Sequence, residues 1–145
     1  MTVGRMAARA WILIGLLALA ACASTPEGNQ STELRVYPVS EEQIRTIIRE
    51  SLVEAMPGIS PVPVDKPGQK GYQSRMWVLI DSHRVRGFYF PAKGRRSDGS
   101  VVSGYRVVVR HSGTILISGP RAARRLHRIL HRRAAEVAAP LPMAN

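Results

Sequence analysis

The middle of this chain repeats apolar side chains at every second position, and a stretch of helical periodicity lies on each side of it. The repeat begins near Ser74 and is clearest at Tyr105, Val107 and Val109. A period of two puts such residues on one face of a β-strand, where they can pack against amphipathic helices. The order strand, helix, three or four antiparallel strands, helix predicts an α+β domain. We expect a two-layer sandwich, with an antiparallel sheet of about four strands and both helices on one face.

The first helix is expected to begin just after Ser40. Ser40 and Gln43 match a capping box, and Glu41 and Glu42 suit a first turn, where the helix dipole favours negative charge. Pro57-Gly58 should end the helix. Its apolar face is Ile44, Ile47, Ile48, Leu52 and Ala55.

The last helix is expected to open at Gly119-Pro120, because a proline in the first turn of a helix loses no hydrogen bond. Its apolar stripe is Ala122, Leu126, Ile129, Leu130 and Val137. Together the two helices supply one apolar layer for the sheet.

The strands are expected between polar turns. We expect a short strand over 34–39, a loop over 58–73 rich in glycine and proline, and a strand from Ser74. Further along the chain, the residue types indicate three turns: Asp81-Ser82-His83, a polar hairpin loop over 91–100, and Ser112-Gly113 leading into a strand over 114–118.

Strand parity leaves one question open. Arg84, Arg86, Phe88 and Phe90 share one face of their strand, and Val85, Gly87 and Tyr89 share the other; Arg106 and Arg110 lie opposite the apolar face of the next strand. The face with arginine and phenylalanine is either an open binding platform or part of the core. A bulge near Gly87 would exchange the two faces.

The amino terminus has the three parts of a secretory signal peptide. Arg5 and Arg9 precede an apolar run over 11–19, which is too short to span a bilayer, and small residues follow. Leu19-Ala20-Ala21-Cys22 resembles the lipobox of bacterial lipoproteins. That resemblance implies that Cys22 is lipidated, that residues 1–21 are removed, and that the chain is anchored in a membrane.

The same resemblance also predicts which membrane holds the anchor and how the remaining residues are divided. Ala23 follows the cysteine where proteins retained in the inner membrane often have aspartate, so it indicates the outer membrane, facing the periplasm. Residues 22–33 should be the lipidated cysteine and a flexible tether, 34–138 a single domain, and 139–145 a disordered tail. Cys22 is the one cysteine, so no internal disulfide can form.

Positive charge is concentrated in the second half. Residues 22–83 contain six basic and eight acidic residues, whereas 84–145 contain thirteen basic and two acidic ones. Arginine binds phosphate and carboxylate groups through a planar, multi-donor fork. We expect an arginine-rich helix face and sheet face to bind anions, unless they are merely solvated. Along the helix, only Glu136 could neutralise any of these arginines. The candidates are Arg121, Arg124, Arg125, Arg128 and Arg132 on the helix, and Arg106 and Arg110 on the sheet.

Three other motifs carry weaker signals. The run 86–90 resembles the start of an RNA-recognition-motif signature, but Tyr89, Pro91 and Lys93 depart from it, and no nucleic-acid partner is expected. His127 and His131 have the spacing of a metal pair, yet Arg128 stands where a zinc hydrolase has glutamate. Asp81-Ser82-His83 contains the three residue types of a hydrolytic triad, but adjacent side chains point apart and cannot form the hydrogen bonds that a triad needs.

These observations predict a lipid-anchored cell-envelope lipoprotein that acts as a non-enzymatic binding or assembly accessory. No cofactor, metal or catalytic residue is expected. The basic half would engage anionic lipid, lipopolysaccharide or an acidic envelope protein. Two alternatives stay open. One is an envelope enzyme acting on glycan or peptide with a site in loop 91–100, which a convergent cleft of Asp81, His83 and Asp98 would favour. The other is a structural subunit of an outer-membrane or secretion complex.

Overall fold

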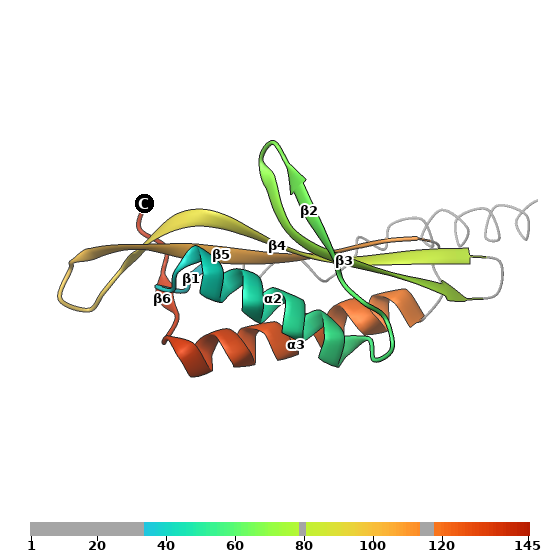
Figure 1. Cartoon of the computed structure of the whole chain (residues 1–145). Helices are drawn as coiled ribbons and strands as arrows, with labels where there is room; N and C mark the ends of the chain where they lie inside the picture. Colours follow the sequence, from blue (N-terminus) through green and yellow to red (C-terminus); the bar gives the residue numbers. More distant parts are fainter. Residues whose placement is uncertain (1–33, 79–80, 114–117) are drawn as a thin grey trace, which may run out of the picture.

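The computed structural model describes residues 34–78, 81–113 and 118–145. The strands β2 to β5 form one antiparallel sheet in chain order, and the helices α2 and α3 lie side by side against one of its faces (Figure 1). The predicted α+β sandwich is therefore confirmed. The elements are β1 (Arg35–Val36), α2 (Glu41–Ala55), β2 (Val62–Lys66), β3 (Gln69–Val78), β4 (Asp81–Arg95), β5 (Val101–Ser112), α3 (Ser118–Val137) and β6 (Leu141–Pro142).

The core lies between the helices and the sheet. Gly87 on β4 lets α2 come close, because a Cβ atom at this position would lie 2.8 Å from Cγ2 of Ile48. The expected apolar faces of both helices are largely buried, which supplies the main driving force for packing the two layers. The buried core includes Ile44, Ile48 and Leu52 of α2, Leu126 and Leu130 of α3, and Val85, Tyr89 and Val107 of the sheet.

Helix α2 begins as expected. The Oγ atom of Ser40 accepts a hydrogen bond from the backbone N–H of Gln43 at 3.2 Å, and the backbone N–H of Ser40 donates to Oε1 of Gln43 at 2.8 Å. The helix ends before Pro57-Gly58, where Gly58 has a φ of +83°. Helix α3 contains the expected Gly119-Pro120 in its first turn.

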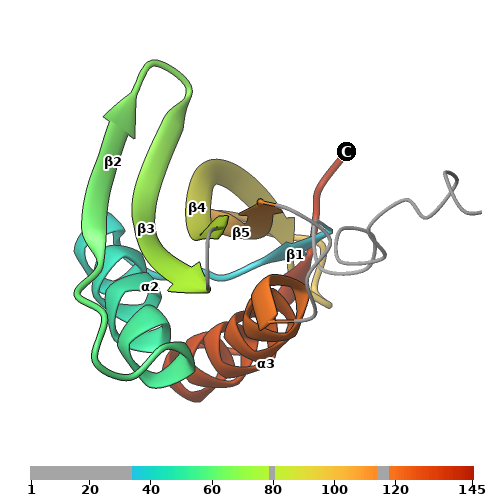
Figure 2. The same ribbon diagram turned by 90° about the vertical axis from the view of Figure 1, so that its right-hand side faces the viewer.

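The loop expected over 58–73 is wrong, because β2 and the start of β3 form a hairpin there. Lys66 pairs with Gln69, and Gly68 in the turn between them has a φ of +73°. Most of β2 is exposed, so its sequence lacks the apolar alternation of a packed strand. The hairpin rises from the sheet on the side away from the helices (Figures 1 and 2).

The remaining turns shift by a few residues. Asp81-Ser82-His83 opens β4 rather than forming a turn: Val78 pairs with Asp81, so residues 79–80, outside the described residues, make the connection. The β4–β5 loop is shorter than 91–100 because β4 continues to Arg95. Pro91 fits within β4 because the pairing with β3 stops at Tyr89, which leaves β4 one free edge there. The strand expected over 114–118 falls on residues 114–117, outside the described residues, and on Ser118, which opens α3.

The expectation of a disordered tail over 139–145 is wrong. Strand β6 pairs antiparallel with β1, so Arg35 lies opposite Pro142 and Val36 opposite Leu141. The backbone N–H of Ala144 also donates to the carbonyl of Lys93 at 2.7 Å. The expected strand over 34–39 is confirmed only as this short β1, which touches the large sheet through a bridge between Tyr37 and Tyr105.

The signal peptide, the lipobox and the tether all fall within residues 1–33, outside the described residues. Within the part of the chain that the structure describes, neither helix has the length and hydrophobicity needed to cross a bilayer.

Candidate anion-binding surfaces

The outer face of α3 carries a row of exposed arginines. These side chains point away from the buried stripe of Leu126 and Leu130. Among the described residues, no carboxylate lies within 4.0 Å of any of them. Four of the five arginines predicted on this helix share these properties: Arg121, Arg124, Arg125 and Arg128.

The fifth, Arg132, belongs to a different network. Its Nη2 atom lies 2.8 Å from Oε1 of Glu54 on α2, and its Nε atom lies 3.8 Å from Glu136. The adjacent Arg133, which was not among the predicted sites, pairs with Glu54 and with Glu50, each at 2.9 Å. Glu136 thus pairs with Arg132 along the helix, as expected, and α2 supplies two further carboxylates across the helix interface.

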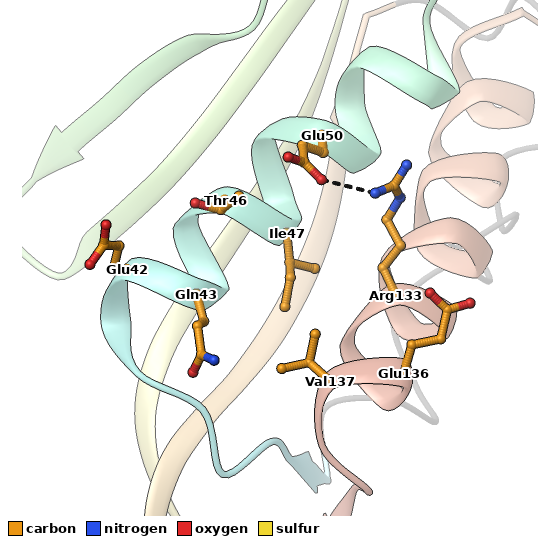
Figure 3. Close-up of a pocket in the computed structure, with 8 residues that line it drawn as sticks. All are labelled: Glu42, Gln43, Thr46, Ile47, Glu50, Arg133, Glu136 and Val137. Atoms are coloured by element: carbon orange, nitrogen blue, oxygen red, sulfur yellow. Dashed lines mark hydrogen bonds and ion pairs between the residues drawn. The ribbon is translucent and has the colours of Figure 1, made fainter.

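These ion pairs border a depression between α2 and α3. Its volume is about 380 Å³, and the bond between Arg133 and Glu50 crosses one side of it (Figure 3). Hydrogen bonds from Arg133 and Arg132 lower the pKa of Glu54. The depression thus marks an electrostatic contact between the helices. Its lining is Glu42, Gln43, Thr46, Ile47, Glu50, Arg133, Glu136 and Val137.

The sheet face away from the helices answers the question that strand parity left open. Val85 and Tyr89 are in the core beneath the helices, so Arg84, Arg86, Phe88 and Phe90 lie on the other face. Arg106 and Arg110 share this face, as predicted. The guanidinium of Arg106 lies 4.8 Å from the ring centre of Phe90, and that of Arg110 lies 5.9 Å from the ring centre of Phe88.

The aromatic residues of this face do not form a stacking platform. Phe88 is 2% exposed and Phe90 is partly covered by Arg106. A base could stack on them only if these side chains moved, whereas RNA-binding sheets present aromatic rings to the bases. The exposed cations, and not the rings, are what this part of the surface offers to a ligand.

The four histidines form two pairs around α3. Nδ1 of His83 lies 3.1 Å from Nε2 of His111, and both lie close to Gly119 at the start of the helix. The rings of His127 and His131 are 4.6 Å apart. Among the described residues, no three histidine, cysteine or acidic side chains gather as a metal site would require.

His131 also contacts the short strand β1. Its Nδ1 atom lies 2.5 Å from the hydroxyl of Tyr37, which is fully buried. Burial lowers the pKa of His131 to about 4, and the nearby charges of His127 and Arg35 act in the same direction. Burial also lowers the pKa of His127. This pair therefore stays neutral near pH 7 and joins α3 to β1.

The residues of the enzyme alternative lie at the two ends of one long strand. His83 is near the start of β4, and Asp98 lies in the loop beyond its end at Arg95. A strand rises about 3.3 Å per residue, so the backbones of His83 and Asp98 are tens of ångströms apart along β4 and do not converge. Asp98 instead accepts hydrogen bonds from the backbone N–H and the hydroxyl of Ser100.

Sequence reasoning missed Arg75 and Trp77, which also lie on the open face. Arg75 is opposite Arg84, and Trp77 is opposite Ser82. Trp77 is 68% exposed, and the guanidinium of Arg75 lies 5.7 Å from its ring centre. The parity of β3 could have revealed both, because Met76 between them faces the core.

No protein-family model matches this chain, and no curated protein or solved structure is significantly similar to it.

Proposed function

We propose that this protein is a lipid-anchored lipoprotein of the bacterial cell envelope and that it acts as a non-enzymatic binding or assembly accessory. Acyl chains on Cys22 would hold it in the outer membrane, facing the periplasm. The basic second half would engage an anionic surface or an acidic partner. A lipid chain combined with a basic patch is a known two-signal arrangement for membrane association.

The observation that carries this proposal is the contrast along α3. Near its carboxyl end, Arg132 and Arg133 are neutralised by glutamates of α2. Near its amino end, Arg124, Arg125 and Arg128 are exposed and have no carboxylate within 4.0 Å among the described residues. Cations that nothing in the fold uses are available to an external anion.

The test measures how tightly the full-length protein, held in nanodiscs of neutral lipid, binds vesicles that contain anionic lipid. Wild type and variants are compared. We expect the triple variant Arg124→Ala, Arg125→Ala, Arg128→Ala to bind more weakly, and the difference to grow at low salt because salt screens exposed charges. A matched triple variant in the first half, Arg45→Ala, Arg49→Ala, Lys66→Ala, removes the same charge and should bind like wild type. Unchanged binding by the α3 variant would contradict the proposal.

A further inference from the structure

Four arginines form a compact grid on the open face of the sheet. Arg75 of β3 is the direct cross-strand partner of Arg84 of β4, and Arg86 of β4 is the direct partner of Arg110 of β5. Directly opposite Cβ atoms in an antiparallel pair are about 5 Å apart, and residues two positions along a strand are about 7 Å apart. The four side chains of this arginine grid therefore start from an area about 12 Å across at its widest, between Arg75 and Arg110.

The grid contains donors and no acceptor of matching charge. Among the described residues, no carboxylate lies within 4.0 Å of its guanidinium groups. Its polar neighbours are neutral: Gln73 lies opposite Arg86, and Ser112 lies opposite Arg84. Nη2 of Arg86 donates a hydrogen bond to Oγ of Ser112 at 3.1 Å.

This arrangement costs stability while no anion is bound. Like charges directly opposite each other on neighbouring strands repel, and here this occurs twice within one patch. The main core lies on the helix-facing side of the same strands, and on the grid side the guanidinium of Arg110 lies beside the buried ring of Phe88. A ligand with several negative charges close together would relieve the repulsion of both pairs at once.

The surroundings of the grid favour a compact ligand with a non-polar face. Trp77 lies at one corner and is 68% exposed, so it offers a large ring beside the cations. The β2–β3 hairpin rises on the same side of the sheet as the grid (Figure 1). A flat bilayer would meet this hairpin before it lay against the sheet, whereas a single headgroup could reach the arginines beside it.

We propose that the arginine grid binds the clustered phosphate groups of an envelope glycolipid, with the sugar ring against Trp77. Guanidinium forks bind phosphate oxygens in pairs, and four of them suit two neighbouring phosphates better than scattered single charges. The inference rests on the proposed function, because it names the anion that one basic surface of an envelope protein would bind.

The probe is the deacylated, phosphorylated oligosaccharide of lipopolysaccharide, titrated into full-length protein in a neutral detergent. The variant Arg84→Gln, Arg86→Gln should weaken binding about tenfold or more, because each guanidinium removed takes charge-assisted hydrogen bonds with it. The matched variant Arg95→Gln, Arg96→Gln, in and beside the β4–β5 loop, removes the same charge and should stay within about threefold of wild type. The dephosphorylated oligosaccharide should bind far more weakly to the wild type.

Several results would overturn this inference. They are no binding by wild type, equal binding of the dephosphorylated sugar, equal weakening in the two double variants, and equally tight binding of polyglutamate, which would point to an acidic protein segment. The grid variant should unfold at the same temperature as wild type or a higher one, since repulsion is removed. If it does not fold, Arg84→Lys, Arg86→Lys replaces it: this variant keeps the charge and loses the fork, and binding as tight as wild type would count against the grid.

The two proposals can fail separately. If the α3 triple variant loses vesicle binding while the grid variant keeps oligosaccharide binding, the proposed function stands and the grid inference falls. If the grid variant loses the oligosaccharide while the α3 variant binds vesicles normally, the grid is supported and the role of α3 is not.

Discussion

The guanidinium of Arg133 on α3 donates two hydrogen bonds to the same carboxylate oxygen of Glu54 on α2, from Nε at 3.1 Å and from Nη2 at 2.9 Å. Arg132 donates to the other oxygen of Glu54 at 2.8 Å. One carboxylate thus fixes two consecutive cations of the facing helix. The rest of the α3 arginines have no such partner among the described residues.

The first prediction concerns this contact. Glu54→Gln should lower the melting temperature by a few degrees, since it removes the charge of the carboxylate that Arg132 and Arg133 share. The pKa of Glu54 is lowered in the fold, so its contribution is present above its ordinary pKa of 4.5 and is lost as the pH falls below that value. Thermal unfolding at pH 7 and pH 3.5 measures both effects.

A double-mutant cycle tests whether the effect belongs to the pair. Glu54→Gln should cost less in an Arg133→Gln background than in wild type, because the partner is already gone. In an Arg128→Gln background it should cost as much as in wild type, because Arg128 has no ion pair in the described structure. Equal costs in all three backgrounds would mean that the contact contributes nothing.

The second prediction concerns His131. Burial lowers the pKa of this ring to about 4, below its ordinary value of 6.5, so protonation favours the unfolded chain. The sign follows directly: stability is fully present above pH 6.5 and falls as the pH drops from there toward 4. An NMR titration should find the ring of His131 still neutral at pH 5.5, and a titration midpoint near 6.5 would refute the prediction.

Tyr37→Phe separates burial from hydrogen bonding at this site. The variant keeps the ring that covers His131 but removes the hydroxyl that lies 2.5 Å from Nδ1. Because burial is the main cause of the shift, the pKa of His131 should stay well below 6.5. The lost hydrogen bond should lower the free energy of unfolding by about 1 kcal/mol.

The third prediction concerns the lipid anchor. Cys22→Ser removes the thiol that the lipobox resemblance identifies as the lipidation site. Cells that express this variant should show no incorporation of radiolabelled palmitate into the protein, and the protein should no longer sediment with membranes as wild type does. Ala21→Ser offers a comparison that leaves the thiol in position. Undiminished labelling of Cys22→Ser would disprove lipidation at this residue.

The two-layer fold was predictable because an element that buries one face needs apolar residues at a regular spacing in the sequence. Ile44, Ile48 and Leu52 repeat at helical spacing since α2 buries one face, and Val85 and Tyr89 fall on alternate positions since β4 buries one side. Strands with few buried side chains show no such spacing. Most of β2 is exposed, and β1 and β6 are two residues long with Val36 as their one fully buried side chain, so a loop and a disordered tail were expected instead.

The candidate surfaces were predictable in part for the same reason. The rotation of about 100° per residue in an α-helix is enough to place Arg124 and Arg128 away from the buried stripe of α3. It cannot show that Glu54 lies opposite Arg132, because that contact joins residues 78 positions apart. The grid likewise depends on the register that sets Arg75 against Arg84 and Val78 against Asp81, which the sequence pattern alone does not determine.

The last prediction tests how closely β1 approaches the sheet. A Cβ atom on Gly104 of β5 would lie 2.3 Å from the carbonyl oxygen of Tyr37, so Gly104→Ala should push the two strands apart. Tyr37 and Tyr105 exchange two backbone hydrogen bonds at this point, at 2.8 and 2.9 Å, and both should weaken. We expect the free energy of unfolding to fall by about 1–3 kcal/mol, as overpacking commonly does, and the amides of Tyr37 and Tyr105 to exchange faster with solvent. Ser103→Ala, at the exposed neighbouring position, should change neither quantity. Stability and exchange rates equal to wild type in Gly104→Ala would show that β1 can shift freely and that this close approach does not hold it in register.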